Sequence, residues 1–378
     1  MCRLTAYIGH PTLVADLVTR PTRSVIRQSF DARERLGGKG GEVYDQGNLN
    51  ADGFGLGWYS HGGSGPDEDV TPCVFADVGP AWHNKNLHNL ARKITSPVIF
   101  AHVRAAGPGM SLCQCSCHPF QCGRYLFMHN GQVAGFQQIR RGLMNNLSDC
   151  AFNFAIANSA SDSALAFAIF LDQLEGTPFA EIAPSQIREH LVKTIEIICA
   201  ALDAHDVQDT SLLNFVVSDG LTLAATRYVR NPKSQVPAAS LYFSSGTRFE
   251  PVHTQAPASP SNGPAPPPCL GHGTKSVPYR IVHDDRRDEV VIVTSEPLTD
   301  DYSDWVPVPN NHLVLVTPQR QVLMAPMFAK FQPCAGAEEA RQEFSDALEA
   351  FGHDKKASTN VRSTKKSESV AALEEMVG

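Results

Sequence analysis

The stretch SLLNFVVSDGLTLAATRYV, residues 211–229, decides the fold class. Two largely apolar, β-prone runs flank Asp219-Gly220, a pair that favours a tight turn, so the stretch predicts an antiparallel hairpin. Further strand-like runs occupy residues 240–245, 289–295 and 312–317. Strands and helices are grouped instead of alternating strictly. This grouping favours antiparallel sheets with helices packed on their faces over a doubly wound parallel sheet.

Helices are predicted upstream of the hairpin. Residues 185–204 are the clearest case, because apolar residues recur there at helical spacing on one face. These residues are Ile187, Leu191, Ile195, Ile198 and Leu202. Residues 161–174 predict a second helix, for which Ser161 is a suitable N-cap.

The N-terminal part contains strand-like segments. Residues 2–9 are β-prone, and residues 98–106 read as a buried strand that runs into a loop. Residues 124–131 predict a strand that ends at a turn-forming Asn-Gly pair. Between them, residues 11–20 predict a short helix with a proline in its first turn.

Length and charge exclude several classes of protein. The chain has 378 residues, which suits one large domain or two ordinary ones. The net charge of -7 argues against a partner such as nucleic acid. No apolar run reaches membrane-spanning length, and the first residues lack the pattern of a secretory signal. We therefore expect a cytoplasmic protein that binds neither nucleic acid nor membrane.

The chain is expected to divide into one domain and a C-terminal segment. Residues 2–330 are expected to form one domain, interrupted by a disordered proline-rich insert at about 254–268. Residues 331–378 are expected to form a C-terminal helix and a disordered tail, because the last stretch is polar and mixed in charge.

The chain contains 10 cysteines, and most are predicted to be reduced thiols, because disulfide frameworks occur mainly in short secreted chains. Several gather in the segment SLCQCSCHPFQC. Its potential ligands are Cys113, Cys115, Cys117, His118 and Cys122. The spacing lacks the paired Cys-x-x-Cys knuckles of common zinc sites. Reduced, redox-sensitive thiols in a loop are therefore expected, and a zinc site is the alternative.

Cys2 is a candidate nucleophile. Removal of Met1 would place a thiol and a free α-amino group on one residue. An α-amino group titrates near pH 7.7–8.0 and a free thiol near 8.5, so the amine can accept the thiol proton near neutral pH. The alternative is that Cys2 is merely a small residue at the start of a strand.

Three further motifs carry groups that suit an amino-acid substrate. Arg104, in AHVRAA, can bind a carboxylate through two parallel hydrogen bonds, or it can form a structural salt bridge. Asn130 and Gly131, in FMHNG, can offer two N–H donors to an oxyanion, or they can form a plain turn. Asp162, in SASDSA, can pair with an ammonium group, or it can simply favour the start of a helix.

The order of these motifs is more informative than any one of them. MCRLTAYIG, NADGFGLGWY, FAHVRAAG, CHPFQCGRYLFMHNG and SASDSA together resemble the class II glutamine amidotransferases. SLYFSSG and IVTSEPLTDDYSDWVPVPNN also resemble one branch of that family, the amidotransferase subunits of the fungal alternative glutathione-degradation complex. The resemblance covers roughly residues 2–325. Two departures are the extra cysteines around CHPF and the SDSA that replaces Ser-Asp-Ser-Glu.

The resemblance implies a fold and a set of roles. The fold is the N-terminal-nucleophile αββα sandwich, an α+β architecture in which two antiparallel sheets lie between helical layers. Cys2 would be the nucleophile, and Asn130 and Gly131 would form the oxyanion hole. Arg104 would hold the substrate carboxylate, and Asp162 would hold the substrate ammonium group.

The resemblance also implies an activity and a partner. The expected activity is cleavage of a γ-glutamyl amide, with glutathione or glutamine as substrate, and the expected partner is a metallopeptidase-like subunit. His118 would lie near the substrate without a definite role, and no cofactor or metal is expected. The alternatives are a γ-glutamyl hydrolase of ergothioneine biosynthesis and a catalytically inactive amidotransferase-like scaffold.

Overall fold

A computed structural model describes most of the chain. The described residues are 1–34, 49–60, 71–107, 112–174, 177–231, 236–252, 276–284 and 289–328. The predicted proline-rich insert and C-terminal tail lie outside these residues. Within the described part of the chain, no helix has both the length and the apolar character that crossing a membrane requires.

The first sheet is antiparallel and has β1 near its centre, between β13 and β4. Its strand order is β14-β10-β13-β1-β4-β2-β3. The strands are β1 (Arg3–Leu13), β2 (Phe54–Trp58), β3 (Cys73–Asp77), β4 (Thr95–Val103), β10 (Tyr242–Gly246), β13 (Val290–Thr294) and β14 (Val306–Pro307). A short ribbon beside it pairs β11 (Arg248–Pro251) with β12 (Tyr279–Val282).

The second sheet is also antiparallel and contains the hairpin predicted from residues 211–229. Its strand order is β16-β15-β8-β7-β6-β5, and β9 pairs with β7. The strands are β5 (Phe120–Cys122), β6 (Tyr125–Gln132), β7 (Ser211–Ser218), β8 (Leu223–Arg227), β9 (Val229–Arg230), β15 (His312–Val316) and β16 (Val322–Pro326). Gly220, at a φ of 90°, makes the tight connection between β7 and β8.

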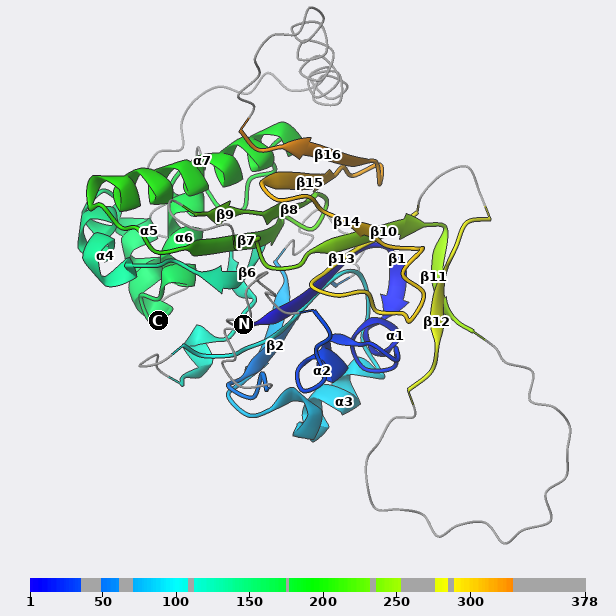
Figure 1. Cartoon of the computed structure of the whole chain (residues 1–378). Helices are drawn as coiled ribbons and strands as arrows, with labels where there is room; N and C mark the ends of the chain where they lie inside the picture. The colour runs from blue at the N-terminus through cyan, green and yellow to red at the C-terminus, as the bar shows by residue number, and fades with distance from the viewer. Residues whose placement is uncertain are drawn as a thin grey trace, which may run out of the picture.

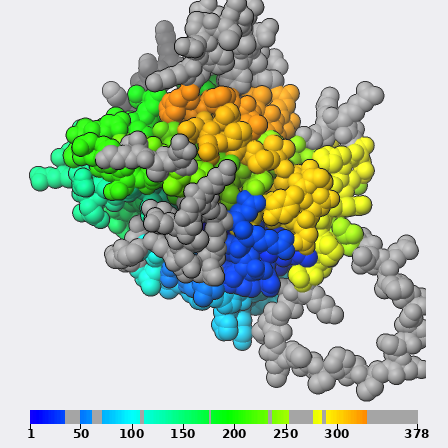
Figure 2. Space-filling model, in the orientation of Figure 1, coloured from blue at the N-terminus to red at the C-terminus, as the bar shows by residue number. Residues whose placement is uncertain are grey.

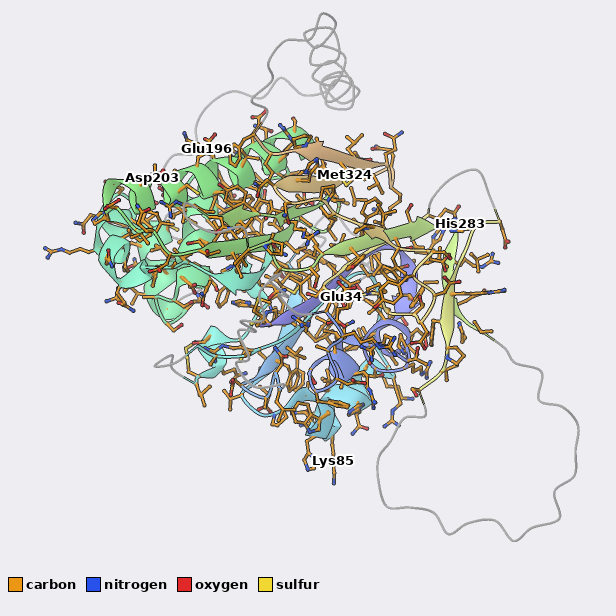
Figure 3. The ribbon with its side chains drawn as sticks, in the orientation of Figure 1. Glu34, Lys85, Glu196, Asp203, His283 and Met324 are labelled. Carbon is orange, nitrogen blue, oxygen red and sulfur yellow. A yellow bond between two sulfur atoms is a disulfide. The ribbon has the colours of Figure 1, made fainter. Side chains whose placement is uncertain are left out.

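Helices cover the outer faces of both sheets (Figure 1). The first sheet carries α1 (Val14–Val18), α2 (Val25–Gln28), the 3-10 turn η1 (Ala81–His83) and α3 (Lys85–Ala91). The second carries α4 (Phe136–Asn145), α5 (Asp149–Ala157), α6 (Asp162–Leu171) and α7 (Pro184–Ala204). Lys85 and Glu196 point outward from these helical layers (Figure 3).

Alternation along the strands separates the apolar cores. In β1, Leu4, Ala6 and Ile8 belong to the core between the two sheets, whereas Tyr7 packs towards the helices of the first sheet. In β6, Met128 faces the core between the sheets and Phe127 faces α6. Successive side chains on a strand point to opposite faces, so each sheet is buried on both sides. The structure confirms the predicted αββα sandwich.

Two local predictions are wrong. Residues 11–13 continue β1 instead of starting a helix, and α1 begins only at Val14. Pro11 is tolerated there because it lies at an irregularity in the β1–β4 pairing, where no ladder hydrogen bond requires its missing N–H. The Asn-Gly pair at residues 130–131 lies inside β6 and forms no turn.

Three buried histidines lie where β4 meets β6. His102 Nε2 is 3.2 Å from the carbonyl oxygen of His129 and 3.2 Å from His118 Nδ1. Burial lowers the pKa of His102 to about 3 and holds the pKa values of His118 and His129 below the usual range. The neighbouring Arg104 charge also lowers the pKa values of His102 and His118. All three rings are therefore neutral near pH 7.

We predict that acid destabilises the protein through these histidines. Below pH 6.5 the His102 imidazole is protonated in the unfolded chain, whereas in the folded protein it stays neutral until about pH 3. The free energy of unfolding should therefore fall as pH drops across this window, by up to about 1.4 kcal/mol per pH unit for each such histidine. Urea unfolding between pH 7 and pH 4 measures this slope.

His102→Gln should flatten the slope, because the amide can replace one hydrogen bond but does not titrate in this range. His205→Gln, which removes an exposed imidazole at the end of α7, is the control for losing a histidine as such. An unchanged slope in His102→Gln would contradict the prediction.

Candidate active site

The register of β1 brings Cys2 to the end of β4. Arg3 pairs with Val103, so Cys2 lies beside the residues that follow β4. Its thiol accepts a hydrogen bond from the Ala105 N–H (3.5 Å) and contacts the Ala105 carbonyl oxygen (3.8 Å). Cys2 is 8% exposed and is therefore nearly buried. Cys2 and Arg104, distant in sequence, are therefore close in space.

The NADGFG motif supports the segment that contains Arg104. Arg104 N–H donates to the Gly53 carbonyl oxygen (2.8 Å), and its guanidinium donates to the Asp52 carbonyl oxygen (3.3 Å). The Asp52 carboxylate accepts the Ala106 N–H (2.9 Å). Gly53 has a φ of 112°, which favours glycine. This motif thus holds the chain that lines one side of the Cys2 thiol.

Asn130 and Gly131 lie near the end of β6 in the second sheet, where they pair with Asn214 and Leu213 of β7. A Cβ atom on Gly131 would stand 1.8 Å from the Leu212 carbonyl oxygen. Position 131 therefore requires glycine, because the two strands approach each other closely there. The position of both residues inside β6 excludes the plain-turn alternative. The two residues remain adjacent and extended, with successive groups on opposite faces of β6.

The Asn130 side chain is fully buried and points to the first sheet. Its Nδ2 donates to Ser295 Oγ (3.3 Å), which also accepts the Leu4 N–H (3.0 Å). Within the described residues, Asn130 Oδ1 is buried and has no hydrogen-bond partner. The Asn130 amide is thus linked through Ser295 to Leu4, which is two residues after Cys2.

Asp162 begins α6 with a buried carboxylate. One oxygen accepts the Val133 N–H (2.9 Å), and the other accepts the Ser163 N–H (2.8 Å). Ser161 caps the helix by accepting the Ala164 N–H (3.1 Å), as predicted. Val133 follows the end of β6, so Asp162 is tied to the strand that carries Asn130. A carboxylate has about four acceptor sites, so this one retains capacity for a further donor.

His118 contacts other histidines. Its Nδ1 accepts the His129 N–H at 3.4 Å and lies against His102. Gly55 of β2 leaves room for this segment, because a Cβ atom there would stand 2.2 Å from the His118 carbonyl oxygen. Among the described residues, the hydrogen bonds of His118 support the strand before Asn130.

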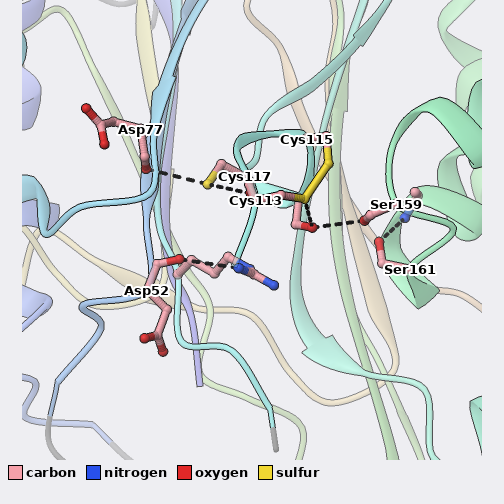
Figure 4. Close-up of a disulfide and its surroundings, with 10 residues drawn as sticks. Asp52, Asp77, Cys113, Cys115, Cys117, Ser159 and Ser161 are labelled. Atoms are coloured by element: carbon pink, nitrogen blue, oxygen red, sulfur yellow. Dashed lines mark hydrogen bonds between the residues drawn. A yellow bond between two sulfur atoms is a disulfide. The ribbon is translucent and has the colours of Figure 1, made fainter. Parts of the chain in front are cut away.

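Two cysteines of the Cys-rich segment form a disulfide, which corrects the prediction that they are reduced. Cys113 and Cys115 are bonded, whereas Cys117 is free and buried (Figure 4). Beside the disulfide, Ser116 Oγ donates to Ser159 Oγ (2.9 Å). The Cys113–Cys115 pairing could not be predicted from the sequence, because alternate spacing alone does not show which thiols are bonded. No group of three or more potential ligands among the described residues could hold a metal ion.

Sequence reasoning missed Glu296, which is 1% exposed. Its carboxylate pairs with Arg3 (3.2 Å) and Arg23 (3.4 Å) and accepts two backbone N–H groups at residues 33–34 (3.0 Å each). Arg3 also donates to the Cys2 carbonyl oxygen (3.1 Å). The sequence signal that could have identified Glu296 was its place in a Ser-Glu pair directly after a predicted strand. In Figure 2 the N-terminal segment lies against the segment that follows β13.

Three of the predicted residues lie on the faces of the two sheets that are turned toward one another. Cys2, Arg104 and Asn130 continue the alternation that turns Leu4, His102 and Met128 to the space between the sheets. Asp162 is linked to the strand that carries Asn130, because its carboxylate accepts the Val133 N–H.

Comparisons with known proteins identify the family of the chain. The family model for class II glutamine amidotransferases matches residues 40–235. The probable glutamine amidotransferase DUG3 of Saccharomyces cerevisiae is 35% identical over 346 residues, which cover 88% of this chain and 85% of the yeast protein. The gamma-glutamyl-hercynylcysteine sulfoxide hydrolase of Mycolicibacterium smegmatis is 32% identical over 182 residues, 48% of this chain and 69% of that protein.

The fold agrees as well. The solved structure of a glutamine aminotransferase class-II domain protein from Silicibacter pomeroyi superposes with a TM-score of 0.51 at 22% identity, covering 86% of this chain and 99% of that one. This likeness supports the sandwich of two antiparallel sheets, and the match to the family model and to the yeast protein supplies the relationship. The chain belongs to the class II glutamine amidotransferases.

Proposed function

We propose that the protein hydrolyses γ-glutamyl amides with Cys2 as an N-terminal nucleophile. The observation that carries this proposal is the position of the Cys2 thiol, which contacts Ala105, the residue after Arg104. Two residues after Cys2, Leu4 is linked to Asn130 through the Ser295 hydroxyl. Backbone pairing of β1 with β4 thus holds Cys2 near Arg104, and the Asn130 amide on β6 is linked to β1 through Ser295.

Activation of Cys2 requires removal of Met1. The Met1 carbonyl oxygen accepts a hydrogen bond from the buried Asn50 side chain (2.5 Å), so Asn50 lies beside the Met1–Cys2 peptide bond. After cleavage of that bond, the free α-amine of Cys2 takes this place and accepts the thiol proton. The thiolate attacks the γ-carbonyl carbon, and the α-ammonium then donates its proton to the leaving amine. Water hydrolyses the resulting thioester and releases glutamate.

Two donors stabilise the oxyanion in this mechanism. Asn130 Nδ2 has two hydrogens, one of which Ser295 occupies, so the second is available to the oxyanion. The Gly131 N–H is the second donor. Loss of one such donor typically lowers kcat by about 10²- to 10³-fold.

The glutamyl half of the substrate is bound by opposite charges. Arg104 binds the α-carboxylate with its planar fork, and Asp162 binds the α-ammonium. His118 holds the strand before Asn130 and has no direct role in chemistry. No cofactor takes part in the steps, since the thiol, the amine and the donors supply the chemistry.

We infer that the leaving group is Cys-Gly and that the substrate is glutathione, cleaved together with a metallopeptidase-like partner subunit in the cytoplasm. The resemblance of the SEPLT region to the fungal glutathione-degradation branch supports this choice. The mycobacterial hydrolase gives the second candidate, a γ-glutamyl hydrolase of the ergothioneine type, because it is 32% identical over 182 residues. An inactive scaffold is the remaining alternative.

Glutamate release tests the nucleophile and the leaving group together. The purified protein, with removal of Met1 verified by intact mass, should release glutamate from glutathione. The assay is run with this protein alone and with the partner subunit added. Cys2→Ala should abolish release, because no other group replaces the thiol. Cys150→Ala, which removes an exposed thiol on α5, should retain it.

The pattern of substrates separates the alternatives. Cys2-dependent release from glutamine but not from glutathione would retain the nucleophile and refute the glutathione assignment. Release only from γ-glutamyl-hercynylcysteine sulfoxide would establish the ergothioneine-type activity. A processed protein that releases glutamate from none of these substrates would favour the scaffold.

Charge removal tests the substrate-binding roles. Arg104→Gln and Asp162→Asn should each raise KM by about 10- to 100-fold, because each loses charge-assisted hydrogen bonds to the substrate. Arg230→Gln is the matched control, since Arg230 is also buried but pairs with Asp203 at the end of α7. KM values that move equally in all three variants would contradict the assigned roles.

A further inference from the structure

The Ser295 hydroxyl lies between the two sheets. Ser295 follows directly after β13 and is fully buried. Its Oγ accepts the Leu4 N–H of β1 at 3.0 Å and the Asn130 Nδ2–H of β6 at 3.3 Å. The Ser295 N–H in turn donates to the Leu4 carbonyl oxygen (2.9 Å). One oxygen atom thus joins the strand of the nucleophile to the buried amide.

The contact with Leu4 replaces a backbone bond. Thr5 pairs with Thr294, so continuation of the ladder brings Leu4 opposite Ser295. The Leu4 N–H, however, donates to the Ser295 side chain and so leaves the regular pattern of the sheet. The hydroxyl is therefore placed by the first sheet, and it meets Asn130 from a fixed position.

Ser295 fixes the orientation of the Asn130 amide. Among the described residues, Ser295 is the hydrogen-bond partner of the Asn130 side chain, and Asn130 Oδ1 has none. A planar amide with one N–H held in place has its second N–H directed as well. Without the hydroxyl, nothing else in the described part of the chain hydrogen-bonds this amide.

We propose that Ser295 is a positioning residue, which orients the Asn130 amide toward the oxyanion and keeps it in register with the strand that carries Cys2. This inference rests on the proposed function, in which Asn130 stabilises the oxyanion. Ser295 contacts no reacting atom, so it acts on the rate of acylation and leaves binding of the glutamyl group to Arg104 and Asp162.

A purely structural role for Ser295 predicts something different, and Thr294 allows the two to be separated. Thr294 is the preceding residue, is equally buried, and bonds the same part of β1, since its hydroxyl donates to the Leu4 carbonyl oxygen (3.1 Å). It has no described hydrogen bond to Asn130. Loss of the Thr294 hydroxyl therefore weakens the strand contact without releasing the amide.

The experiment compares Ser295→Ala with Thr294→Val in the processed full-length protein. Ser295→Ala should lower kcat for γ-glutamyl hydrolysis by about 10-fold, less than the loss of an oxyanion donor itself, with KM and the Kd for glutamate changed less than two-fold. Thr294→Val should leave kcat within about two-fold. In an Asn130→Ala background, Ser295→Ala should have no further effect, because the two residues act as one unit.

A spectroscopic measurement tests the contact independently of turnover. With 15N-asparagine labelling, the Asn130 side-chain amide resonance, identified by its loss in Asn130→Asp, should shift in Ser295→Ala and stay unchanged in Thr294→Val. If Ser295→Ala does not fold, Ser295→Cys retains a weaker acceptor and should give a smaller fall in kcat together with a smaller shift.

The outcomes distinguish this inference from the proposed function. Absence of Cys2-dependent release in the wild-type protein would refute the proposed function. Wild-type release with an equal loss of kcat in Ser295→Ala and Thr294→Val would overturn the positioning role alone. A fall in kcat that persists undiminished in the Asn130→Ala background, or an unshifted amide resonance, would also overturn it.

Discussion

The register of β1 between β4 and β13 is the constraint on which the rest of the site depends. Pairing of Arg3 with Val103 and of Thr5 with Thr294 sets this register. It brings Cys2 to the end of β4 and Leu4 to Ser295. A slip by one residue would move every side chain of β1 to the opposite face, so the thiol would leave the space between the sheets. The site therefore requires this pairing before any of its side chains can act together.

Burial and charge both hold this register. Leu4, Ala6 and Ile8 are fully buried between the sheets, and a slip would exchange them for polar neighbours. At the start of the strand, Arg3 is paired with buried Glu296, which two backbone N–H groups also satisfy. Removing one partner from such a pair leaves an uncompensated buried charge, which is strongly destabilising. The ion pair thus opposes displacement of the residue next to Cys2.

Local patterns were sufficient to predict antiparallel sheets with packed helices, whereas the αββα layering and the proposed site residues came from the resemblance to the family. The hairpin at 211–229 and helix α7 follow from turn preference and from apolar periodicity, which are properties of neighbouring residues. The Asn130-Gly131 pair misled this reasoning, because pairing with β7 overrides its preference for turns. Ser295 could not be identified, since its importance depends on Leu4 and Asn130, which are distant in sequence.

The division of the site between two sheets explains why a buried hydroxyl matters. Cys2 and Arg104 are fixed by the first sheet, whereas Asn130 and the backbone linked to Asp162 are fixed by the second. Apolar packing between sheets holds their distance but is non-directional, so it does not define how an amide is rotated. A hydrogen bond is directional. A hydroxyl that accepts from both sheets therefore supplies the orientation that the packed core between them lacks.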